Sequence, residues 1–103
     1  MYIENKRDTA KRYQGFFEGI IGVEYIPETE FGKSNFWLNA IRFPSKKERD
    51  EFLVYSNDNG VMTRPIWKLM NELNMFKDCP SGCLEVAEAL ENTIVNIPSS
   101  VRI

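Results

Sequence analysis

Helical periodicity is clearest at the start of the chain. Apolar residues recur there one or two turns apart, with charged residues between them: Ile3, Ala10, Tyr13, Phe17 and Ile20. Residues 3–18 are therefore predicted to form a helix, which Gly19 is expected to end. No capping residue precedes this helix, so we expect the natural polypeptide to have further residues upstream of it.

A second helix is predicted after Pro44. The sequence Ser45-Lys46-Lys47-Glu48 is a capping box, in which the serine hydroxyl accepts from one free amide and the glutamate reaches back to another. This helix should run to about residue 57 and bury Phe52 and Leu53. Gly60 is expected to end it, because glycine adopts positive φ without steric cost.

Two more helices are predicted in the last third of the chain. Residues 68–73 should form a short helix, after which Met75 and Phe76 should insert into apolar surroundings. Residues 78–82 contain proline and glycine and are predicted to form a turn. Residues 84–92 should form a helix whose buried face consists of Leu84, Ala87 and Leu90.

Between these helices the pattern changes to that of strands. The clearest strand is 35–43, which alternates Phe36, Leu38 and Ala40 on one face with Trp37, Asn39, Ile41 and Phe43 on the other. Both faces are largely apolar, which predicts a central strand covered on both sides. Asn39 then needs a hydrogen-bond partner if it is buried.

Three shorter strands complete the prediction. They are an extended segment at 22–26, a buried strand at 61–63 and a final strand at 93–97 that Pro98 ends. Helices alternating with strands over 103 residues indicate one α+β domain, with a small antiparallel or mixed sheet of three to four strands and helices packed on it.

The stretch 59–67 concentrates the residues most able to meet a ligand. Pro65 cannot donate to a sheet ladder, so this strand must end or lie at an edge there. Arg64 and Trp67 are thereby placed at a strand end, where a guanidinium and an indole could contact a ligand. The alternative is that Trp67 belongs to the core and Arg64 forms a surface ion pair.

Composition excludes several classes of function. The net charge of −2 with scattered basic residues argues against nucleic acid as a partner. No apolar run is long enough to span a membrane, and the first twelve residues lack the apolar core of a signal peptide, which favours a cytoplasmic protein. Cys79 and Cys83 are expected to be free thiols rather than zinc ligands.

The sequence contains no self-contained catalytic apparatus. It has no histidine, so neither a hydrolytic triad nor the commonest general base is available. The glycines do not form a phosphate-binding loop, and no lysine has the apolar neighbours that would suit it to Schiff-base chemistry. Ser99 and Ser100 could donate to a ligand, although a turn is the better interpretation. We predict no catalytic residue and no metal site in this chain.

Several separated motifs, in a consistent order, resemble one protein family. They are KRDTAKRY at 6–13, NFWLNAI at 35–41, ERDEFL at 48–53, NGVMTRPIW at 59–67, LMN at 69–71, MFK at 75–77 and VNIPSSVR at 95–102. Together they resemble the C-terminal end of the pyridoxal-phosphate-dependent nucleotide-sugar aminotransferases of the DegT/StrS type. The branch that acts on UDP-linked 4-keto sugars, towards bacillosamine- or legionaminic-type sugars, is the most similar.

The resemblance implies that residues 1–103 are the small C-terminal domain of a fold type I aminotransferase. The large domain, with its Schiff-base lysine and its other pyridoxal phosphate ligands, has no counterpart here. The chain alone should therefore bind no cofactor and be inactive. Its implied partners are the N-terminal large domain, a second subunit in a homodimer and a nucleotide-sugar substrate, in an enzyme of lipopolysaccharide or glycan biosynthesis.

The resemblance also implies substrate-binding residues in the complete enzyme. These are Arg64, Trp67, Ile66 and Asn35. Ile66 stands where many relatives have a histidine, and it cannot form that residue's hydrogen bond. Trp67 is expected to stack on the base, and Arg64 to pair with a diphosphate or with the partner subunit. The competing hypothesis is a stand-alone α+β binding or interaction module of ferredoxin-like type.

Overall fold

The computed structural model describes residues 1–102, which form three α-helices, two short 3-10 helices and one sheet. In chain order these are α1 (Tyr2–Glu18), β1 (Glu24–Tyr25), β2 (Asn39–Arg42), α2 (Lys46–Asp58), β3 (Arg64–Pro65), η1 (Met70–Glu72), η2 (Asn74–Phe76), α3 (Glu85–Thr93) and β4 (Ile94–Ile97). The four strands lie in the order β1-β2-β4-β3, and every neighbouring pair is antiparallel. The predicted α+β fold class is confirmed.

One face of the sheet carries the core. Tyr25, Ile41 and Val95 are register partners on three adjacent strands, and all three are buried. Asn39 and Ile97 form the next pair on the same face, because side chains two residues apart along a strand point the same way. Helices α1 and α2 pack Tyr13, Phe17, Phe52 and Leu53 against this cluster.

The opposite face of the sheet is much more open, and here the prediction of a doubly covered central strand is wrong. β2 does lie inside the sheet, between β1 and β4, but Arg42 and Leu38 are exposed. The strand is also shorter than predicted, since it begins at Asn39. Phe36 has a φ of +50°, so the backbone before β2 turns and takes Trp37 out of the predicted alternation.

The segment after α2 also differs from its prediction. Gly60 ends the helix with a φ of +82°, as expected, and Ser45 Oγ accepts the amide of Glu48 at the other end. The predicted buried strand at 61–63 is wrong, because the pairing with β4 begins only at Arg64 and Met62 is exposed. Of that segment only Thr63 is buried; its hydroxyl lies 2.6 Å from Ser56 Oγ.

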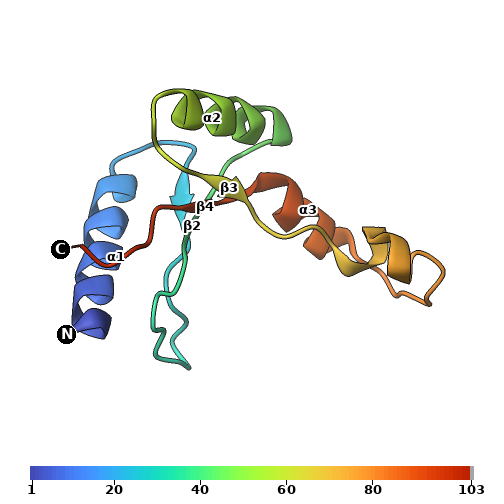
Figure 1. Ribbon diagram of the computed structural model, residues 1–103, viewed down its shortest axis with the longest axis horizontal. Coiled ribbons are helices and arrows are strands. Elements are labelled where there is room, and N and C mark those ends of the chain that lie inside the picture. The colour runs from blue at the N-terminus through green and yellow to red at the C-terminus, as the bar shows by residue number, and fades with distance from the viewer. Residues whose placement is uncertain (103) are drawn as a thin grey trace.

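Residues 66–93, which we call the arm, extend away from the sheet on the side opposite α1 (Figure 1). The predicted helix at 68–73 is only a single 3-10 turn, and Met75 is exposed rather than inserted into an apolar site. Leu84, Ala87 and Leu90 are half-buried, so the predicted face of α3 is only partly covered. The molecule measures 45 × 32 × 25 Å, and the arm contributes most of this elongation.

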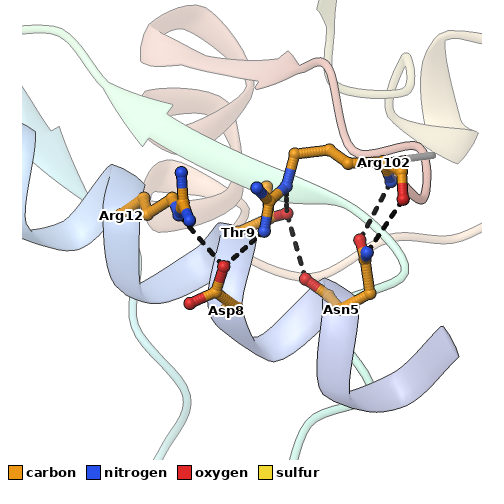
Figure 2. A network of polar contacts seen from close by, with 5 residues as sticks. All are labelled: Asn5, Asp8, Thr9, Arg12 and Arg102. Carbon is orange, nitrogen blue, oxygen red and sulfur yellow. Dashed lines mark hydrogen bonds and ion pairs between the residues drawn. The ribbon is translucent and has the colours of Figure 1, made fainter. Parts of the chain in front are cut away.

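The C-terminal residues run back along α1, and a polar network joins them (Figure 2). The Asn5 amide donates to the Arg102 carbonyl, and its Oδ1 accepts the Arg102 amide, both at 2.9 Å. The Arg102 guanidinium donates to Thr9 Oγ1 and to Asp8, which also pairs with Arg12. The two ends of the described chain are thus attached to each other.

Candidate functional site: a groove on the open face of the sheet

A groove of about 560 Å³ lies beside β3 and the end of β4. Arg64 and Asn96 are register partners and lie on the face opposite Val95, so they belong to the open side of the sheet. The groove continues along the residues that follow β4. Its lining is Leu38, Met62, Arg64, Pro65, Trp67, Asn96, Ile97, Pro98, Ser99 and Ser100.

Arg64 supplies the positive charge of this groove. β3 is an edge strand, as Pro65 required, and the Arg64 side chain is exposed beside it. One guanidinium nitrogen donates to the Thr63 carbonyl at 3.1 Å. Within residues 1–102 no carboxylate pairs with Arg64, so the surface ion pair considered as an alternative does not form. The remaining N–H donors of the Arg64 guanidinium are free to bind an anion.

Trp67 supplies the aromatic surface of the groove. Its side chain is 67% exposed, so the alternative that Trp67 belongs to the core is wrong. The Trp37 ring lies next to it, with 6.1 Å between ring centroids and an interplanar angle of 38°. This centroid distance lies within the range of attractive aromatic pairs. The pair combines segments that are thirty residues apart in the sequence.

The structure brings together two of the four predicted site residues. Arg64 and Trp67 line the groove, whereas Ile66 and Asn35 do not. Ile66 is half-buried, and its amide donates to the Ile94 carbonyl at 3.4 Å. Asn35 lies in the loop before β2, where its Oδ1 accepts the Trp37 amide at 3.0 Å. A ligand contact by any of the four stays a prediction.

Lys6 links two segments of the chain that line the groove, but it does not line the groove itself. Its Nζ donates to the Trp37 carbonyl at 3.3 Å and to the Ser99 carbonyl at 2.8 Å. One carbonyl precedes Leu38 and the other precedes Ser100, and both of these residues line the groove. Neither Lys6 nor Trp37 was identified from the sequence as part of this site. The sequence offered one hint of the role of Trp37, which is that the chain has only two tryptophans. The structure shows that Trp37 is exposed.

A buried polar cluster supports the groove from inside the sheet. Ser99 Oγ accepts from the backbone amide and the side-chain amide of Asn39, at 2.8 and 3.2 Å, and donates to the Ile97 carbonyl. The Tyr25 hydroxyl donates to Asn39 Oδ1 at 2.7 Å. Asn39 thereby has the partners that its burial required. Burial raises the pKa of Tyr25 to about 12, so its hydroxyl stays protonated as a donor at neutral pH.

The groove is suited to binding rather than to chemistry. Arg64 is its single ionisable side chain, and Ser99 is already committed to the buried cluster. Among the described residues, no group of three potential metal ligands gathers. Across residues 1–102, no helix has the length and apolar character needed to cross a bilayer. The arrangement offers an anion-binding guanidinium, an indole and an apolar surface.

Comparisons with known proteins place this fold among aminotransferases. No protein-family model matches the chain. EpsN of Bacillus subtilis, named a pyridoxal phosphate-dependent aminotransferase, is 24% identical over 74 residues, which are 72% of this chain and 19% of EpsN. The chain therefore spans about a fifth of this relative's length.

Solved structures match over almost the whole chain. The structure of DesI with its TDP-sugar product matches with a TM-score of 0.86 and 20% identity, over 98% of this chain and 27% of DesI. A DegT/DnrJ/EryC1/StrS aminotransferase from Brucella abortus matches with a TM-score of 0.78 and 20% identity, over 95% of this chain and 26% of that protein. The resemblance seen in the sequence is thus confirmed as a shared fold, which occupies about a quarter of these larger chains.

Proposed function

We propose that residues 1–103 are the C-terminal small domain of a pyridoxal-phosphate-dependent aminotransferase that converts a nucleotide-linked 4-keto sugar into an amino sugar. The fold shared with sugar aminotransferases supports this proposal, as do the separated sequence motifs. The chain is inactive alone and works with an N-terminal large domain in a homodimer. We assign the enzyme to the cytoplasmic synthesis of surface glycans, in the bacillosamine or legionaminic branch.

The main support for the proposal is the large solvent-accessible surface area of this chain. The accessible surface is 7913 Å², about 1,900 Å² more than the roughly 6,000 Å² expected for a compact monomer of this mass. The radius of gyration is 15.3 Å, against about 13 Å for a compact domain of this length. Large apolar side chains are exposed on α1, on α2 and along the arm. This surface has the extent that contact with a large domain and a second subunit would cover.

The residues of this chain do not fit the role of holding pyridoxal phosphate. When bound, that cofactor is attached to a lysine amine, and it supplies the chemistry of amino-group transfer. Six of the seven lysines are exposed, and the Lys6 amine is occupied by two backbone carbonyls. Within residues 1–102 none is enclosed in an apolar pocket. We therefore propose that the residues that hold the cofactor lie in the rest of the enzyme.

The role of this chain is to bind and orient the substrate. Arg64 is available to an anionic diphosphate through charge-assisted hydrogen bonds. The exposed Trp67 ring offers a surface on which a base can stack, worth about 1–3 kcal/mol in other proteins. Leu38, Pro65 and Pro98 add apolar surface to the same groove. DesI, which shares the fold, was solved with a TDP-sugar product.

The coding DNA immediately upstream of Met1 tests the proposal. We expect an open reading frame that encodes a large domain with a Schiff-base lysine. A stop codon followed by a ribosome-binding site directly before Met1 would instead support the stand-alone binding module. A second test treats the isolated chain with pyridoxal phosphate and borohydride. We expect no specific lysine adduct, and a stoichiometric adduct on one lysine would contradict the proposal.

A further inference from the structure

We infer that Trp37, which does not line the groove, is a positioning residue that sets the orientation of the Trp67 indole. Both indoles are about two-thirds exposed, so burial holds neither of them in place. The two rings form an aromatic pair, with a centroid distance of 6.1 Å and a tilt of 38°. The Trp67 side chain lines the groove, whereas Trp37 stands outside it.

Trp37 is able to act as a support because its own backbone is held on both sides. Asn35 Oδ1 accepts its amide at 3.0 Å, and Lys6 Nζ donates to its carbonyl at 3.3 Å. The preceding residue, Phe36, is held as well, since Ser34 Oγ accepts its amide and the Arg7 guanidinium lies 5.3 Å from its ring centroid. Asn35 therefore acts through Trp37 in this arrangement.

The loop that carries Trp37 is attached to α1 at a second point. The Arg7 guanidinium bonds to both carboxylate oxygens of Glu28 and to the Ser34 carbonyl at 2.6 Å. Glu28 also accepts the Ser34 amide, and the pKa of its carboxyl is lowered, chiefly by the hydrogen bond from Arg7. The base of the loop is thus closed by charged groups, and it presents Trp37 to Trp67 from a fixed position.

A positioned indole matters because an exposed tryptophan otherwise samples several rotamers. A ligand that stacks on a mobile ring must pay the entropy of ordering that ring, and a pre-oriented ring lowers this cost. The ligand class is a planar ring that carries anionic groups, because Arg64 lies in the same groove. The choice of a uridine nucleotide as the probe rests on the proposed function.

The two tryptophans of the chain allow a direct test without any ligand. In both W37F and W37A, Trp67 is the single remaining tryptophan, and excitation at the red edge of its absorption keeps its emission separate from that of the four tyrosines. Phenylalanine at position 37 preserves an aromatic contact, and alanine removes it. We expect time-resolved anisotropy to show faster local motion of Trp67 in W37A than in W37F. Equal local motion of Trp67 in the two variants would overturn the inference.

A matched control uses another aromatic residue of the same loop. Phe31 is 97% exposed and forms no aromatic pair among the described residues. Phe31→Ala in the W37F background should leave the anisotropy of Trp67 unchanged. Circular dichroism of every variant checks that the fold is preserved. A change in the control as large as that in W37A would point to general loosening of the loop and would contradict the inference.

Binding of uridine diphosphate, measured by calorimetry, tests the consequence for the groove. We expect W37A to weaken binding by about 2- to 12-fold, the range of one aromatic pair, and W37F to restore most of it. Because Trp37 acts through Trp67, W37A should add nothing in a W67A background. Additive effects would contradict the inference. If neither the wild-type chain nor its complex with the separately expressed large domain binds this nucleotide, the nucleotide part of the proposed function fails, and the anisotropy still decides the role of Trp37.

Discussion

The Tyr25 hydroxyl donates a hydrogen bond to Asn39 Oδ1 over 2.7 Å inside the sheet, where both side chains are buried. Asn39 also donates to Ser99, which forms part of the groove wall. One polar cluster thus links β1 and β2 to the segment that follows β4. Its members are buried, so each depends on the others for its hydrogen bonds.

Removal of the Tyr25 hydroxyl tests this cluster. Tyr25→Phe leaves a buried carbonyl oxygen of Asn39 without its partner, and we expect the free energy of unfolding to fall by about 1–3 kcal/mol. Urea denaturation provides the measurement. Tyr55→Phe is the matched control, because Tyr55 is exposed on α2, and it should change stability by less than about 0.5 kcal/mol. Equal effects of the two substitutions would show that the cluster contributes nothing specific.

Alkaline pH should destabilise the chain through the same residue. The pKa of Tyr25 is raised from 10.0 to about 12, mainly by burial, so the folded state binds the phenolic proton more tightly than the unfolded state. This stabilisation is complete below pH 10 and is lost as the pH rises towards 12. Unfolding followed across this range should show a smaller pH dependence in Tyr25→Phe. An unchanged dependence would assign the effect to other groups.

Two glycine substitutions should change stability in opposite directions. Gly60 has a φ of +82°, which an alanine adopts at a cost of about 1–2 kcal/mol, so Gly60→Ala should destabilise the chain. Gly15 lies in α1 with open space where a Cβ would be, and Gly15→Ala should stabilise by about 0.5–1 kcal/mol. Thermal unfolding of both variants measures the difference. Destabilisation by Gly15→Ala would contradict the helical assignment of that position.

Acid should release the C-terminal residues from α1. The pKa of Asp8 is lowered from its ordinary value of 3.8, first of all by the hydrogen bond from Arg102. The contribution of this carboxylate is therefore present above pH 3.8 and is lost as the pH falls below that value. Asp8→Asn should mimic this loss at neutral pH and speed carboxypeptidase digestion of the tail. Asp58→Asn, on the exposed end of α2, is the control and should not change the digestion rate.

The open apolar surface predicts self-association of the isolated chain. Ile21, Phe31, Met75 and Val86 are among the most exposed apolar side chains, and they are spread over the turn after α1, the loop before β2 and the arm. Sedimentation velocity at increasing concentration should show reversible oligomers. Addition of the separately expressed large domain should replace them with a defined complex. If the chain stayed strictly monomeric at high concentration, the result would contradict the prediction that this apolar surface is an interface with another polypeptide.

Much of the fold follows from local patterns in the sequence. The periodicity of residues 3–18 predicted α1 to within one residue at its start, and the Ser45 cap with Gly60 bounded α2. These signals are reliable because helix ends satisfy their own backbone groups nearby. The alternation correctly placed Asn39, Ile41 and Phe43 together on one face, and all three are buried, although both faces of the strand were expected to be covered.

The same reasoning predicted only half of the candidate site. Arg64 and Trp67 were identified because Pro65 had to lie at an edge, which leaves its neighbours exposed. Trp37 was assigned to the sheet instead, because nothing in the pattern indicates the positive φ of Phe36 that turns the chain there. Lys6 has no sequence signal, since its two carbonyl partners lie 31 and 93 residues away.

The sequence by itself determined where α1, α2 and α3 lie and that Asn39 needs partners. Only the tertiary structure decided which face of the sheet stays open, that the arm leaves the core, and that Trp37 meets Trp67. The physical reason is the range of the interactions. Caps and periodicity act within one or two turns, whereas the groove is formed by side chains that meet only after distant strands have paired.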